Sequence, residues 1–187
     1  MAIKKSVTKH LDKGGIAYEV VPHKKVYTAY DLAQTLGEKL DNIAKTLLVK
    51  VELPKVEKRG TYYVLAVPAS YRANLEKIKK TLKARKVELA DEKAMEKLGL
   101  TPGAITPFGP LHKLEVLLDK GLLKAKKALV RAGSYTESLR VKVKDLHGQE
   151  GVTLGQFSDK AKLKLQAAVR KAVRTVRKAS RKLKKRR

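Results

Sequence analysis

The 187-residue sequence contains no cysteine and no long apolar run. Without cysteine, disulfides, thiol nucleophiles and thiolate metal sites are excluded. No stretch approaches the roughly 18 apolar residues of a membrane-spanning helix. The N-terminus, MAIKKSVTKHL, is basic but lacks the apolar segment of a secretory signal. These absences predict a cytoplasmic protein with no membrane partner.

Acidic residues are also scarce, with 18 Asp and Glu against 44 Lys and Arg and a net charge of +26. Half of this charge lies in residues 158–187, which hold 14 Lys and Arg and one Asp. Such a balance favours a polyanionic partner, most often nucleic acid; an anionic membrane face or a merely soluble surface are the alternatives. We therefore expect a folded domain over residues 1–157 and a strongly basic tail over 158–187.

Helix and strand signals alternate along the first 157 residues. Thr28 precedes Asp31 by three residues and Asn74 precedes an apolar stripe, as helix N-caps do. Helices are predicted over residues 2–15, 28–37, 74–83 and 91–99. Strands are predicted over residues 16–21, 44–51, 61–68, 86–90, 114–119, 127–132 and 138–143, with 44–51 and 61–68 as neighbours. The order lacks a regular βαβ rhythm, so we expect an α+β fold with a mixed, barrel-like curled β-sheet and flanking helices.

The basic tail has the pattern of a helix with one narrow aliphatic stripe. Its apolar residues recur every three or four positions: Leu165, Val169, Ala172, Val173, Val176, Ala179 and Leu183. The other faces carry cations, and no aromatic residue is present to stack on bases or anchor in lipid. Phosphate contact is therefore favoured. The predicted RNA-binding residues are Arg170, Lys171, Arg174, Arg177, Lys178, Arg181 and Lys182.

Common signatures of metal and nucleotide chemistry are missing. The four histidines, His10, His23, His112 and His147, are far apart and lack metal-ligand spacing such as HExxH. There is no GxxxxGK[ST] or GxGxxG motif for phosphates and no GxSxG nucleophile elbow. We expect neither a metal nor another cofactor.

Three features together are typical of a pocket for a small polar ligand. In NIAKTLLVKVE, residues 42–52, a strand's period of two places Lys45 at the start of an apolar row. That row continues with Leu47, Val49 and Val51, opposite Thr46, Leu48, Lys50 and Glu52. The uncharged loop GAITPFG runs from Gly103 to Gly109, and its glycines permit close approach of the backbone to a ligand. The third feature, AGSYTES (132–138), is rich in hydroxyl groups. Each feature alone is more often structural.

Along most of residues 1–150 the chain resembles the YbaK/EbsC aminoacyl-tRNA deacylases, which are related to the editing domain inserted in bacterial prolyl-tRNA synthetases. The segments that carry the resemblance are AYEVVPH with YTAYDLA, AKTLLVKV, YVLAVPA, KKVELA, PGAITPFG with LEVLLDK, and AGSYTESLRVKVKDL. The resemblance implies a barrel-like fold and hydrolysis of the ester between a wrong amino acid and the 3′ end of tRNA. It implies that Lys45 contacts the substrate end of the tRNA, while Gly103 and Pro107 belong to a G-x-x-x-P loop whose backbone lies against the ester.

The chain departs from the family pattern at two positions. Relatives often have His where this chain has Tyr135, and some members that act on cysteinyl-tRNA have an acidic residue at the position of Ser138. The other pocket residues expected from the resemblance are Ser134, Thr136, His23, Tyr27 and Thr28. The leading hypothesis is a monomeric trans-editing enzyme for mischarged tRNA carrying a small amino acid such as alanine, with a synthetase as an optional second partner. The alternatives are a non-catalytic RNA-binding or ribosome-associated module, and a tail that targets a membrane or the nucleus.

Overall fold

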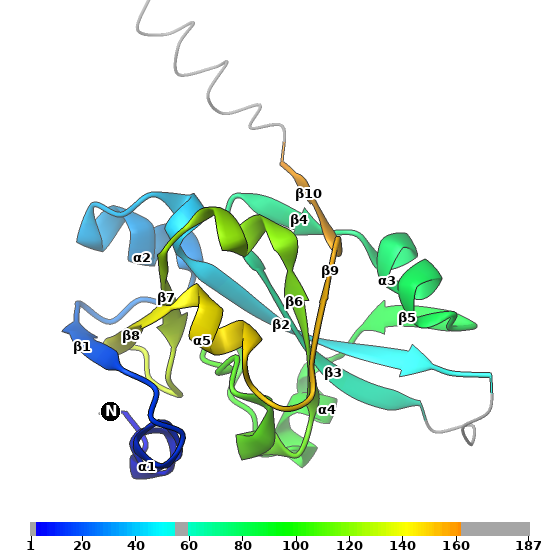
Figure 1. Cartoon of the computed structure of the whole chain (residues 1–187), viewed down its shortest axis with the longest axis horizontal. Coiled ribbons are helices and arrows are strands. Elements are labelled where there is room, and N and C mark those ends of the chain that lie inside the picture. The colour runs from blue at the N-terminus through cyan, green and yellow to red at the C-terminus, as the bar shows by residue number, and fades with distance from the viewer. Residues whose placement is uncertain (1–2, 55–59, 162–187) are drawn as a thin grey trace, which may run out of the picture.

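The computed structural model describes residues 3–54 and 60–161, which form a mixed α+β fold (Figure 1). The α-helices are α1 (Lys5–Lys13), α2 (Ala29–Leu36), α3 (Leu75–Leu82), α4 (Glu92–Lys97) and α5 (Val143–His147). The strands are β1 (Tyr18–Pro22), β2 (Ala44–Glu52), β3 (Thr61–Pro68), β4 (Tyr71–Ala73), β5 (Lys86–Leu89), β6 (Glu115–Asp119), β7 (Lys127–Arg131), β8 (Glu137–Lys142), β9 (Val152–Gly155) and β10 (Ser158–Lys160). Short 3-10 turns lie at Leu40–Asn42, Gly109–His112 and Lys120–Lys124.

The strands form three sheets. The largest has the order β5-β2-β3-β6-β9, the second has the order β1-β8-β7, and β10 pairs with β4 in the third. The first two sheets meet at an isolated parallel bridge between Ile43 and Leu129. The barrel-like closure that the sequence predicted is therefore not reached: within residues 3–54 and 60–161, a single bridge joins the two sheets and no ladder closes them into a barrel.

The predicted neighbouring strands form the antiparallel hairpin β2–β3, with Lys45 opposite Val67 and Val51 opposite Thr61. The apolar row of β2 packs into one core cluster with Val67, Ile78 and Phe157. The opposite face is buried as well, because Leu48 packs against Ile105 in a second cluster. Lys45 thus lies in a strand that is covered on both sides, where an ammonium group is unfavourable unless it is partnered.

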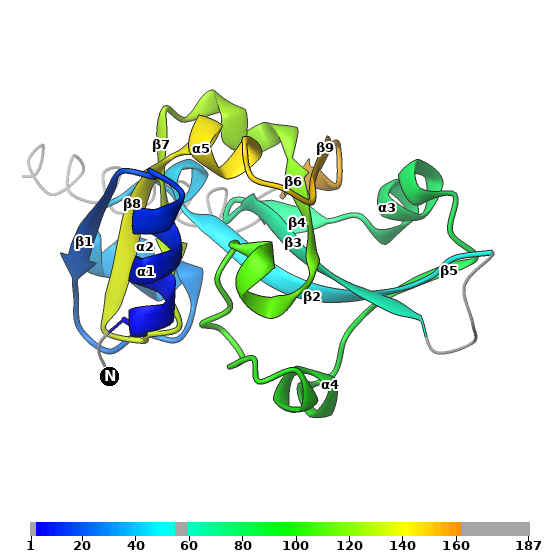
Figure 2. The same cartoon turned by 60° about the horizontal axis from the view of Figure 1, so that its bottom comes forward.

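Side chains cap the N-termini of three of the helices in the described residues. The side chain of Thr28 accepts a hydrogen bond from the Asp31 amide, Asn74 does the same for Lys77, and Asp91 for Ala94. Figure 2 shows α1 lying across the β1–β8–β7 sheet, where Val7 and Leu11 join the core of that sheet. These caps and contacts confirm the four helices that the sequence predicted before residue 100.

Four elements were missing from the sequence prediction: α5, β4, β9 and β10. The three strands are short and carry no clear alternation of apolar residues. Strand β10 lies within the range assigned to the basic tail, yet it pairs with β4 through Ser158–Ala73 and Lys160–Tyr71. The start of the predicted tail helix is therefore a strand. The rest of that helix, from residue 162, and the seven predicted RNA-binding residues lie outside the described residues: Arg170, Lys171, Arg174, Arg177, Lys178, Arg181 and Lys182.

Candidate active site

A cavity of about 240 Å³ opens where the first two sheets meet. Four residues predicted from the sequence line it: Lys45, Gly103, Tyr27 and Thr28. The rest of the lining is mainly apolar, with one further cation: Ala29, Tyr30, Leu32, Ile43, Ala44, Thr46, Leu47, Met95, Ile105, Leu129 and Arg131. No carboxylate belongs to this lining among the described residues. The cavity therefore suits a ligand that brings hydrogen-bond acceptors or negative charge.

Lys45 is half-buried at the start of β2. Its Nζ donates a hydrogen bond to the backbone carbonyl of Tyr71 at 2.7 Å. Burial lowers the pKa of Lys45 below its usual value, and the nearby positive charge of Arg72 lowers this pKa further. An ammonium has three hydrogen-bond donors, and the Tyr71 carbonyl uses one of them. Lys45 is therefore a cation that is positioned by one hydrogen bond, and little negative charge in the cavity lining balances its charge.

The loop that contains Gly103 and Pro107 is fixed against β2 and against Tyr27. Gly103 has φ +72°, and a Cβ at this position would lie 2.9 Å from the backbone oxygen of Tyr27. The Thr46 hydroxyl donates to the Ile105 carbonyl at 2.5 Å, which ties the loop to the strand of Lys45. Pro107 is buried and does not line the cavity. Two features therefore require glycine at position 103: its left-handed backbone conformation and the close approach of the Tyr27 carbonyl.

Tyr135, at which the family resemblance led us to expect His, connects two neighbouring segments of the chain. Its hydroxyl donates to the Pro102 carbonyl at 2.7 Å, next to Gly103. Its ring lies against the ring of Tyr27 with centroids 4.8 Å apart and planes tilted by 59°. Tyr135 therefore links the glycine loop to the segment before α2, and its hydroxyl proton is already directed at a carbonyl.

Arg131 was not singled out by sequence reasoning, because one cation among 44 gave no signal. It is only 5% exposed and lines the same cavity as Lys45. Its Nη2 donates to the carbonyls of Val26 at 3.0 Å and Thr28 at 3.4 Å. Nη1 is buried without a hydrogen-bond partner in the described chain, and burial lowers the pKa of Arg131. The guanidinium holds the backbone on both sides of Tyr27.

The other predicted pocket residues do not line the cavity: Ser134, Thr136, Ser138 and His23. His23 Nδ1 is 2.7 Å from the Lys24 carbonyl, to which it can donate, and its Nε2 is 2.9 Å from the Ser138 hydroxyl. Ser138 and Ser134 are buried. Ser134 Oγ accepts from the amides of Thr136 and Glu137 and so shapes the β7–β8 turn.

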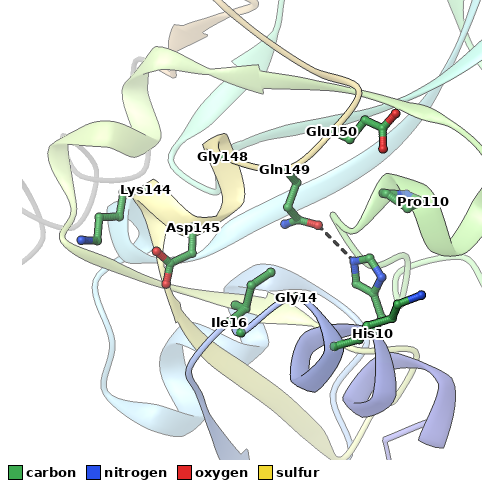
Figure 3. A pocket seen from close by; sticks show the side chains of 11 residues that line it. His10, Gly14, Ile16, Pro110, Lys144, Asp145, Gly148, Gln149 and Glu150 are labelled. Carbon is green, nitrogen blue, oxygen red and sulfur yellow. Dashed lines mark hydrogen bonds between the residues drawn. The ribbon is translucent and has the colours of Figure 1, made fainter.

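A larger and more open groove of about 580 Å³ lies between α1, α5 and the residues that follow α5 (Figure 3). In it His10 Nε2 is 3.2 Å from the side-chain oxygen of Gln149. The exposed Lys144 is a wall residue. In the described residues, no group of three or more His, Cys, Asp or Glu side chains could hold a metal ion, and no helix is long and apolar enough to cross a membrane.

Residues 23–148 match the model of the aminoacyl-tRNA editing domain, which is more than half of the chain. The chain therefore belongs to the aminoacyl-tRNA editing domain family. It is 29% identical over 128 residues to the prolyl-tRNA editing protein ProX of Acetoanaerobium sticklandii, a match that covers 66% of this chain and 75% of that protein. It is also 30% identical over 105 residues to the proline–tRNA ligase of Thermosipho melanesiensis, covering 56% of this chain and 17% of the ligase.

Solved structures share the fold. A hypothetical protein superposes with a TM-score of 0.73 at 23% identity, covering 83% of this chain and all of the other. A protein described as a candidate trans-editing enzyme for prolyl tRNA synthetase superposes with a TM-score of 0.69 at 22% identity, covering 84% and 99%. At these identities the comparison concerns the fold alone.

Proposed function

We propose that this protein hydrolyses the ester that joins a wrong amino acid to the 3′ end of a tRNA. The observation that carries the proposal is one cavity lined by both Lys45 and Gly103, within a chain of the editing-domain family. The coverage of ProX along three quarters of its length, against 17% of the ligase, favours an enzyme that acts on tRNA released by a synthetase. A synthetase is an optional second partner.

The chemistry follows from where charge develops. Water attacks the ester carbonyl carbon, the carbonyl oxygen becomes an oxyanion, and the bond to the ribose oxygen then breaks as that oxygen takes a proton. The Lys45 ammonium and the backbone of the Gly103–Pro107 loop would stabilise the oxyanion in a partly dry cavity. No carboxylate lines the cavity among the described residues, so the ribose hydroxyl beside the ester and an ordered water are the proposed proton carriers.

A small amino acid such as alanine on tRNAPro is the proposed substrate. The cavity of about 240 Å³ has to accept both the ester and the amino-acid side chain, which leaves little room for a large side chain. Both curated relatives are named for proline. The basic residues beyond residue 161 would contact the tRNA phosphates in a manner that is independent of the amino acid.

The direct test is deacylation of Ala-, Ser-, Thr- and Cys-tRNA, including mispaired tRNAPro, by the wild type and by Lys45→Ala. Hydrolysis by the wild type and its loss in the folded variant are expected. If both proteins bind tRNA and neither releases an amino acid from any member, the editing proposal fails. The non-catalytic RNA-binding module on the same fold would then explain the basic charge.

A further inference from the structure

Tyr27 combines an exposed ring with a fixed backbone. Tyr27 lies in the segment between β1 and α2, is 55% exposed and lines the cavity. Exposed tyrosines in connecting segments usually need no fixed position. The backbone of this one is held from several directions.

Four separate contacts hold the Tyr27 segment. Arg131 donates to the carbonyls on both sides of it, at Val26 and Thr28. The Val26 amide donates to the Tyr135 carbonyl at 3.0 Å, and Gly103 lies so close to the Tyr27 carbonyl that no Cβ would fit. On the other side, the Thr28 side chain caps α2. A buried guanidinium used to fix an exposed aromatic residue indicates that the position of the ring matters.

The ring of Tyr27 is supported on one side and reachable on another. Tyr135 lies against it at 4.8 Å and is itself anchored to the Pro102 carbonyl. The ammonium of Lys25, an exposed side chain, lies 5.5 Å from the ring centroid and can move aside. Every nucleobase has a flat face that stacks on an aromatic ring, and a nearby cation suits the phosphate of the same nucleotide.

We propose that Tyr27 is a preformed stacking platform for the terminal nucleobase of the tRNA 3′ end, with Tyr135 and Arg131 as the residues that position it. This rests on the proposed function for the source of the base, and it adds the part of the substrate that is held outside the cavity. A base on Tyr27 would place its ribose and ester at the cavity mouth, toward Lys45. The basic tail contributes no aromatic residue to this role.

The test measures the contribution of the base alone. Binding of AMP and of 1,4-anhydroribitol 5-phosphate, which lacks only the base, is measured by calorimetry on the full chain. The same two compounds, aminoacylated with the residue released fastest from the tRNA panel, serve as minimal substrates. Leu89→Ala in β5 is the matched control, because Leu89 is 54% exposed and lies outside the cavity lining.

The wild type and Leu89→Ala should prefer the base-containing compound about tenfold or more, in Kd and in KM. Tyr27→Ala should lose this preference in both Kd and KM, while Tyr27→Trp should retain it. Equal binding of the two compounds by the wild type, or an unchanged preference in Tyr27→Ala, would overturn the platform. Failure of the proposed function is distinct, because it removes hydrolysis from both substrates and leaves the AMP binding measurement intact.

Discussion

The cavity beside Lys45 and the groove beside His10 differ in how deeply their cations are buried. The groove beside His10 (Figure 3) is more than twice as large as the cavity beside Lys45, yet both of its lysines, Lys13 and Lys144, are exposed. The smaller cavity contains two cations that burial has partly removed from water, and both have lowered pKa values. Partial desolvation makes a charge act strongly on a ligand, whereas an exposed charge is screened. The comparison predicts that the catalysed reaction takes place in the smaller cavity, beside Lys45.

The largest effect should come from Lys45→Met, compared with Lys144→Met in the groove. Loss of a charge that stabilises an oxyanion lowers kcat by about 100- to 1,000-fold, whereas the groove variant should keep wild-type activity. Steady-state deacylation measures both. An equal loss of kcat in the two variants would contradict the assignment of catalysis to the cavity and not to the groove.

Lys45→Met, which should lower activity, should not lower the stability of the fold. Because burial and Arg72 lower the pKa of Lys45, the unfolded chain binds more protons just below the ordinary lysine pKa of about 10.4. The free energy of unfolding of the wild type therefore rises with pH in that window. Lys45→Met removes the buried charge, so urea unfolding at neutral pH should show stability equal to or above that of the wild type, and the gain should shrink toward pH 10.

Two glycines with the same backbone conformation sharpen the comparison. Gly103 has φ +72° and a close carbonyl, whereas Gly15, in the groove, has φ +62° and nothing within 4 Å of an added Cβ. Alanine at either position pays the left-handed strain, about 1 kcal/mol or more in urea unfolding. Only Gly103→Ala should also displace Tyr27 and the loop, with a loss of kcat/KM of at least about tenfold. Comparable activity in both variants would mean that the close approach is irrelevant.

Two truncations separate RNA binding from support of the cavity. Removal of residues 162–187 takes away 13 Lys and Arg and should raise KM for tRNA, flatten its salt dependence and leave kcat unchanged. Removal of residues 158–187 also removes β10, which pairs with β4. Strand β4 contains Tyr71, whose backbone carbonyl accepts the hydrogen bond from Lys45. This longer truncation should lower kcat and Tm as well. Identical kinetics of the two truncated proteins would contradict the link from β10 to Lys45.

Local chemistry explains what the sequence could predict. Thr28 and Asn74 cap the helices that they were expected to begin. Alternating apolar residues identified β2, and aromatic and β-branched residues identified its partner β3. Lys45 and Gly103 were predicted to lie together by family resemblance, and the cavity contains both. Their supporting contacts could not be predicted, because they involve backbone groups: Lys45 meets the Tyr71 carbonyl and Arg131 meets the carbonyls beside Tyr27.

The smallest expected effect concerns His112, which contacts the loop at Thr106 and does not line the cavity. His112 Nε2 is 3.1 Å from the Thr106 hydroxyl, and burial, followed by the charge of Lys4, lowers the pKa of His112. Below pH about 6.5 the unfolded chain therefore binds a proton that the folded chain resists, so stability falls as the solution is acidified. His112→Gln should reduce this slope by at most about 1.4 kcal/mol per pH unit. Urea unfolding from pH 7.5 to 5 measures the slope, and NMR titration of the imidazole checks its origin. An imidazole that titrates at or above its ordinary pKa would contradict the acid-sensitive support of the Gly103–Pro107 loop.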